Sequence, residues 1–89
     1  MRKELLTADL ISNVIDDVGP DWHDLGTELR IEAAKVRNLE HDYQKVRERA
    51  GRVLEIWIEK NGTEATVGRL ACALIKIERK KIADKLFGM

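Results

Sequence analysis

Apolar residues recur at helical spacing from the start of the chain. Two rows spaced three and four apart lie on one helix face: Leu6, Leu10, Val14 and Ile11, Ile15, Val18. Thr7 is a suitable N-cap for these rows, so the pattern predicts a helix over residues 7–18. Gly19-Pro20 ends that helix, because proline disfavours the helical conformation in the residue before it and suits the first turn of the next helix.

Five more segments show the helical period, and none of them shows the alternation of a strand. We predict helices over residues 21–30, 32–37, 43–60, 64–76 and 79–87. The apolar positions expected to form the core are Leu10, Val14, Trp22, Leu25, Leu29, Val53, Leu54, Trp57, Leu70, Leu74, Ile82 and Leu86.

The residues between these segments predict where the helices begin and end. Asp42 and Thr63 are expected as N-caps of the fourth and fifth helices, and Asn61-Gly62 as the C-cap of the fourth. Gly51 inside the fourth helix costs about 1 kcal/mol relative to alanine, which predicts close packing or a locally weak helix there. Six helices joined by short loops predict an all-α antiparallel six-helix bundle, with residues 1–89 forming a single domain.

The charges cancel over the whole chain but are unevenly placed. Residues 4–42 hold ten acids and three bases, whereas residues 43–89 hold eleven bases and six acids. A dipolar arrangement of this kind suits head-to-tail association with similar modules. The alternative is that a surface with 36% charged residues merely keeps a small bundle soluble.

Composition limits the class of protein further. The chain has 89 residues, enough for one small domain, and its single cysteine, Cys72, excludes an internal disulfide. That cysteine usage fits a reducing compartment, so we expect a cytoplasmic location. No apolar run approaches the roughly 20 residues that span a bilayer, and the neutral net charge argues against general binding of polyanions. We therefore expect neither membrane insertion nor a nucleic-acid partner.

The residues that support catalysis in other proteins are poorly arranged here. Ser12 has no histidine at a local spacing, and His23, His41 and Cys72 match no metal-ligand pattern. Adjacent carboxylates on a helix, as at positions 16–17, point about 100° apart and form no acid/base pair. We expect no enzymatic activity, no cofactor and no metal.

A set of short motifs resembles the death-domain family over nearly the whole chain. The motifs are Val18-Gly19-Pro20-Asp21-Trp22, Leu25 and Leu29, Trp57, Ala65-Thr66-Val67 with Leu70, Ala73-Leu74, and Ile82-Ala83-Asp84-Lys85-Leu86. The resemblance implies a six-helix adaptor module that binds other death domains, in a receptor tail or a partner adaptor. It also implies a role in apoptotic or innate-immune signalling complexes, and self-association into helical oligomers through unlike patches.

Two alternatives remain open at this point. A receptor or a kinase can carry such a domain as the receiver, and only flanking sequence would distinguish that case. A helix-turn-helix module that binds nucleic acid would need a basic, exposed recognition helix. The neutral net charge and the acidic first half of the chain oppose the second alternative.

Charged residues on the predicted polar faces are the candidates for partner contact. The acidic candidates are Asp16, Asp17, Asp24 and Glu28, and the basic candidates are Arg47, Arg49, Arg52, Lys76, Arg79 and Lys80. A solvated surface is the competing interpretation for both groups, because exposed ion pairs contribute little. Asp21 is expected mainly to cap the second helix. The stretch His23-Asp24 and Gly26-Thr27 lacks the basic residues that related adaptors carry there.

Overall fold

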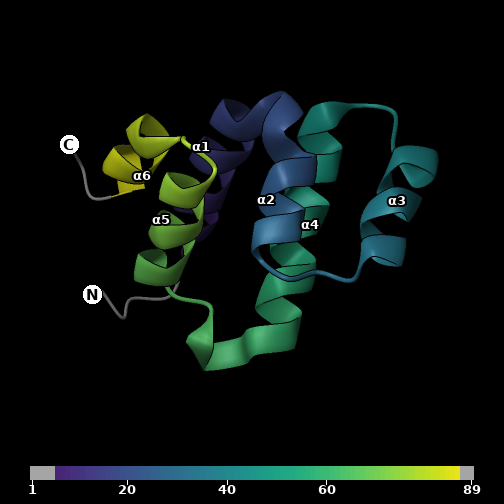
Figure 1. Cartoon of the computed structure of the whole chain (residues 1–89). Helices are drawn as coiled ribbons and strands as arrows, with labels where there is room; N and C mark the ends of the chain where they lie inside the picture. Colours follow the sequence, from purple (N-terminus) through teal and green to yellow (C-terminus); the bar gives the residue numbers. More distant parts are fainter. Residues whose placement is uncertain (1–5, 87–89) are drawn as a thin grey trace.

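The fold is built from helices joined by short turns. The computed structural model describes residues 6–86. Within them it contains α1 (Ala8–Val18), α2 (Trp22–Glu28), α3 (Ala33–Asp42), α4 (Val46–Asn61), α5 (Val67–Lys76) and α6 (Lys80–Leu86). Two 3-10 turns, Gly19–Asp21 and Gly62–Glu64, join α1 to α2 and α4 to α5. The predicted all-α bundle is confirmed (Figure 1).

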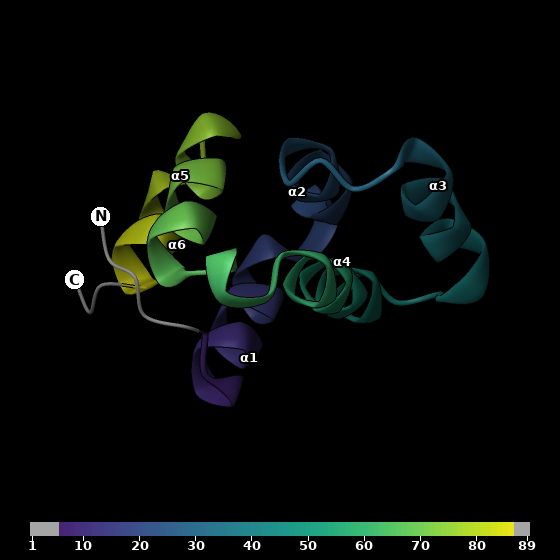
Figure 2. The same cartoon turned by 90° about the horizontal axis from the view of Figure 1, so that it is seen from below.

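Helix α4 lies at the centre of the arrangement, where it packs against α1, α2 and α3. Helices α5 and α6 form a second closely packed pair, which α1 contacts through α6 and α2 contacts through α5. Helix α3 lies on the opposite side of α2 and α4 from this pair, as both views show (Figures 1 and 2). The edge position of α3 leaves one of its faces to solvent.

The core contains eleven of the twelve residues that the spacing predicts to be buried. Val18, Leu25, Leu54 and Leu70 have no exposed surface, and the two tryptophans retain 5% or less. Leu10 is the exception, because it is only partly buried against the core cluster. It lies in the first turn of α1, at the edge of that cluster, where fewer neighbours enclose a side chain than around Val18.

Several helix ends follow the predicted local chemistry. The Thr7 Oγ1 accepts a hydrogen bond from the Leu10 amide at 3.2 Å, which confirms the N-cap of α1. Gly19 and Gly62 end α1 and α4 with φ of 44° and 54°, in the left-handed region that favours glycine. A Cβ on Gly51 would lie 3.3 Å from the Ile15 Cδ1, so close packing of α1 on α4 explains this glycine.

Other helix ends differ from the prediction. Helix α3 continues through Asp42 because buried Val36 and Leu39 extend its apolar face, so Asp42 does not cap α4, whose N-cap is Lys45. Helix α5 is capped by Thr66, whose Oγ1 accepts from the Arg69 amide at 3.3 Å. The expected cap, Thr63, lies in the 3-10 turn that lengthens this connection. The predicted end of the last helix at Phe87 lies outside the described residues.

Two helices end in the left-handed conformation without a glycine. Arg30 after α2 and Glu78 after α5 have φ of 63° and 64°. In both turns an amide reaches back five residues, from Ile31 to the Gly26 carbonyl at 3.1 Å and from Arg79 to the Leu74 carbonyl at 2.7 Å. These bonds close the helix ends in the Schellman pattern and hold strained backbone at both positions.

Candidate functional site

The acidic first half and the basic second half of the chain meet inside this one molecule. Four ion pairs join carboxylates of α1, α2 and the turn between them to bases on α4, α5, α6 and the turn between α5 and α6. They are Asp16–Arg47 at 2.6 Å, Asp17–Lys85 at 3.0 Å, Asp21–Arg79 at 2.5 Å and Glu28–Lys76 at 3.6 Å. Six of the ten charged candidates for partner contact are thus paired within the fold.

The two members of most of these pairs differ in exposure. The carboxylate side chains of Asp17, Asp21 and Glu28 are 20–33% exposed, whereas their basic partners are 44–69% exposed. In the Asp16–Arg47 pair the two side chains are about equally exposed, at 57% and 59%. In three of the four pairs the base thus covers the acid, and the charge presented to solvent is positive.

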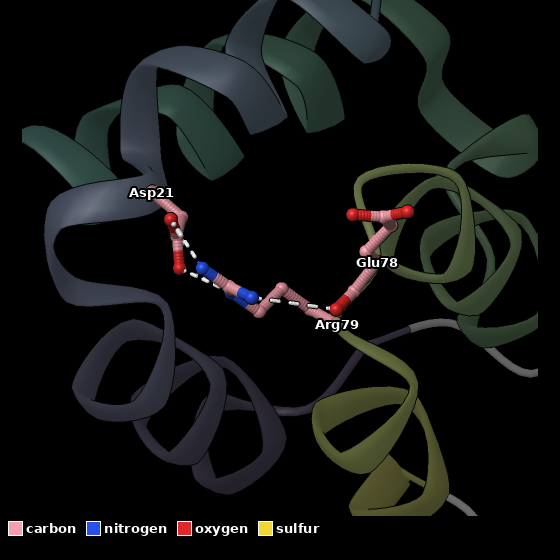
Figure 3. A network of polar contacts seen from close by, with 3 residues as sticks. All are labelled: Asp21, Glu78 and Arg79. Atoms are coloured by element: carbon pink, nitrogen blue, oxygen red, sulfur yellow. Dashed lines mark hydrogen bonds and ion pairs between the residues drawn. The ribbon is translucent and has the colours of Figure 1, made fainter.

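The pair between Asp21 and Arg79 is the most completely hydrogen-bonded of the four. Arg79 donates from Nε and Nη2 to the two carboxylate oxygens, at 2.5 and 2.9 Å, and from Nη1 to the Glu78 carbonyl at 3.4 Å (Figure 3). The hydrogen bonds from Arg79 lower the pKa of Asp21, partly against its desolvation, and the same contact raises the pKa of Arg79. Asp21 occupies the predicted N-cap position of α2, but its side chain forms no cap hydrogen bond and pairs with Arg79 instead.

Arg49, a candidate for partner contact, is held by the protein itself. Its Nε donates to the Tyr43 carbonyl at 2.7 Å and its Nη2 to the Glu40 carbonyl at 3.2 Å, at the end of α3. Its guanidinium also lies 5.4 Å from the ring centroid of Trp22, a cation–π distance. Arg49 therefore ties α2, α3 and α4 together, which is a structural task.

The remaining candidates lie on the surface. Arg52 pairs along its own helix with Glu55 at 2.8 Å and Glu59 at 3.8 Å, and the hydrogen bond to Glu55 raises its pKa. Asp24 and Lys80 are exposed, and among residues 6–86 neither forms an ion pair.

A basic edge follows from these positions. We use this name for Lys76, Arg79, Lys80 and Lys85, which lie on α5, α6 and the turn between them and are all exposed. Positions 76–86 contain five bases and two acids. Lys85 was not among the sequence candidates, and its pairing with Asp17 spans 68 positions, beyond the reach of local spacing.

Two other kinds of site are absent from the part of the chain that the structure describes. Residues 6–86 bring together no group of three histidine, cysteine or acidic side chains that could hold a metal ion. None of the helices α1 to α6 has the length and apolar character needed to cross a bilayer.

Comparison with known proteins now decides the family. The sequence profile of the death domain matches residues 8–89. The chain belongs to the death domain family. This death domain is 35% identical over 74 residues to human FAS-associated death domain protein, covering 81% of this chain and 36% of that protein. The mouse protein of the same name is 33% identical over 72 residues.

A further relative has a different name. Mouse THO complex subunit 1 is 28% identical over 85 residues, which covers 96% of this chain and 13% of that protein. This death domain therefore spans only 13–36% of the length of the curated relatives it matches.

The motifs that carried the family resemblance have structural tasks in this death domain. Trp22 and Trp57 are 4% and 5% exposed core residues. Thr66 caps α5 and Val67 is fully buried behind it. Recognition of the family thus rests on residues that build the bundle, whereas the exposed charges decide which surface it presents.

Proposed function

We propose that this death domain is a cytoplasmic adaptor module, without catalytic activity, that binds other death domains. The partners would be a receptor tail or another adaptor, within an apoptotic or innate-immune signalling complex. Support comes from family membership, since death domains are protein-interaction modules, and from similarity to FAS-associated death domain protein in two mammals.

One observation carries the choice of surface. Along the basic edge, Lys76, Arg79 and Lys85 lie over less exposed carboxylates, and Lys80 adds a charge that pairs with no described acid. Exposed ion pairs stabilise a protein by only about 0–1 kcal/mol. These bases can therefore exchange their intramolecular carboxylates for those of an acidic partner surface at little cost in stability. The excess positive charge would also accelerate the encounter with such a partner. The contact would be small, polar and weakened by salt.

Fewer acidic residues are available for a second contact than the sequence indicates. The side chains of Asp17 and Glu28, which pair with Lys85 and Lys76, are 30% and 33% exposed, whereas that of Asp16 is 57% exposed and Asp24 is exposed without an ion pair among residues 6–86. We propose Asp16 and Asp24 as the acidic contacts. A basic edge and an acidic face on one module are unlike surfaces, so copies would join head to tail and continue into helical oligomers.

The test of the basic edge is capture of this chain by purified death domains, including that of human FAS-associated death domain protein, at low and high salt. Lys80→Glu should lower capture about tenfold at low salt, because a reversed charge at contact distance changes the interaction by roughly 1–2 kcal/mol. Lys35→Glu on exposed α3 makes the same change on the opposite side of the bundle and should leave capture unchanged. Equal effects of the two variants would reject the basic edge.

The test of the acidic face is the double reversal of Asp16 and Asp24 to lysine. This change should abolish binding to a basic partner surface while the circular dichroism of the bundle is retained. Because the Asp16–Arg47 pair is exposed and Asp24 forms no ion pair among residues 6–86, the change should cost the fold little. Unchanged binding would show that the acidic contact lies elsewhere.

A further inference from the structure

An open groove lies beside the basic edge and shares only Lys76 with it. It runs between the C-terminal ends of α2 and α4 and the exposed side of α5, with a volume of about 730 Å³. In Figure 1, α2 and α5 stand on either side of this region, with the lower part of α4 leading into α5. The apolar part of its lining consists of Leu29, Trp57, Cys72 and Ala73.

The charged side chains around the groove are mainly basic. Arg30, Lys60, Arg69 and Lys76 line it, against the single acid Glu28. Glu28 forms an ion pair with Lys76 at 3.6 Å. Arg69 forms an ion pair at 3.1 Å with Glu64, which does not line the groove.

Two of these bases keep their charge uncompensated. The Lys60 Nζ lies 3.4 Å from the Arg30 carbonyl, a neutral acceptor. Among residues 6–86, neither Lys60 nor Arg30 forms an ion pair with a carboxylate. Two positive charges therefore face solvent at the ends of α2 and α4, beside an apolar surface.

We propose that this groove binds a short acidic peptide segment of a partner protein, with an apolar side chain beside Cys72 and the small exposed edge of Trp57, and carboxylates at Arg30 and Lys60. Charge complementarity selects this occupant. The bases come from α4, α5 and the turn after α2, so they suit carboxylates spaced along a peptide better than a single compact anion.

A second groove on the molecule shows why charge matters for this choice. The groove between α3 and α4, of about 650 Å³, is lined by three acids and three bases, namely Glu32, Asp42, Glu59, Lys35, Arg52 and Lys60. Its balanced lining gives no preference for the charge of an occupant. The groove beside α5 is lined by four bases and one acid, and therefore favours a negatively charged occupant.

The two proposed surfaces are separable by mutation. Arg30 lines the groove beside α5 and no part of the basic edge, whereas Lys80 belongs to the edge and lines no part of the groove. Lys60 also borders the groove between α3 and α4, so Arg30 is the cleaner probe. Although Lys76 belongs to both surfaces, Arg30 and Lys80 each test one of them, so failure of either proposal is visible by itself.

The single cysteine provides the measurement. Cys72 is exposed and lines the groove, so an environment-sensitive fluorophore attached to it would report an occupant directly. The probe is a synthetic peptide of glutamate and aspartate residues around central leucines. Its controls are a peptide with lysine at every acidic position and a single-stranded oligonucleotide. Intrinsic tryptophan fluorescence of the unlabelled chain checks that the label itself creates no site.

The acidic peptide should give a saturable signal whose dissociation constant rises with salt. Arg30→Glu should raise that constant about tenfold and Arg30→Gln by a smaller factor, with Lys80→Glu close to wild type. Circular dichroism shows whether each variant is folded, and Arg69→Gln provides a second change if Arg30→Glu is not. An unchanged constant in the folded groove variants, an equal loss in Lys80→Glu, or equal binding of either control molecule overturns the proposal.

Discussion

Two glycines inside helices, one buried and one half-buried, allow a matched test of how the helices approach one another. Gly26 lies in α2 and Gly51 in α4, and alanine at either position gains about 1 kcal/mol of helix propensity. The two variants therefore share the same gain in helix propensity. The difference between their free energies of unfolding reports only the contacts of the added methyl group.

The surroundings of the two methyl groups are unlike. At Gly51 the new Cβ would lie 3.3 Å from the Ile15 Cδ1, the free end of a side chain that can move by a few tenths of an ångström. At Gly26 it would lie 3.3 Å from Val36 and 3.5 Å from Val53. These are β-branched side chains with stiff χ1 angles, 2% and 0% exposed, so neither can yield.

These contacts set the expected magnitudes. Gly51→Ala should keep most of the propensity gain and raise stability by up to about 1 kcal/mol, which corresponds to roughly 4–8 °C in Tm. Gly26→Ala should add an overpacking cost of about 1–3 kcal/mol and come out neutral or destabilised by up to about 2 kcal/mol. The two variants should thus differ by about 1–3 kcal/mol.

Urea unfolding followed by tryptophan fluorescence measures this difference, because a change in midpoint at constant slope is a change in stability. Thermal unfolding by circular dichroism provides an independent check. If Gly26→Ala stabilises the domain as much as Gly51→Ala does, the packing of α2 against α3 and α4 is looser than these contacts require, and the reasoning fails.

Three further changes test single features of the fold. Because the pKa of Asp21 is lowered, its ion pair stabilises the domain above the ordinary pKa of 3.8 and loses that effect as the pH falls through the lower folded pKa. The urea midpoints of wild type and Asp21→Asn should therefore differ near neutral pH and converge in strong acid. Glu78→Gly should stabilise the domain by about 0.5–1 kcal/mol by relieving the left-handed backbone, whereas Glu78→Ala, which keeps that strain, should not. Arg49→Met should destabilise the domain by about 1–3 kcal/mol and increase amide hydrogen exchange in α3, whose end Arg49 holds, while exchange in α5 changes less.

The helices and most of the core were predictable from the sequence because their signals are local. The spacing of Val14 and Val18, and of Leu70 and Leu74, sets which face of a helix is apolar, and such a face is stable only when buried. Gly62 marks the end of α4 for an equally local reason, its positive φ. The N-cap of α5 was harder to predict from the sequence, because Thr63 and Thr66 have the same chemistry. Only the 3-10 turn Gly62–Glu64 decides which of the two begins the helix.

The charged surface depended on tertiary structure. The sequence shows that one half is acidic and the other basic, but not that Asp17 meets Lys85 or that Asp21 meets Arg79. It likewise gives no sign that Arg49 turns inward to two carbonyls while Lys80 stays exposed. Helical periodicity sets the direction of a side chain around its own axis and carries no information on which helix packs opposite. By itself the sequence determined six amphipathic helices and their family, whereas the packing of α1, α2, α5 and α6 decided which charges neutralise one another and which face a partner.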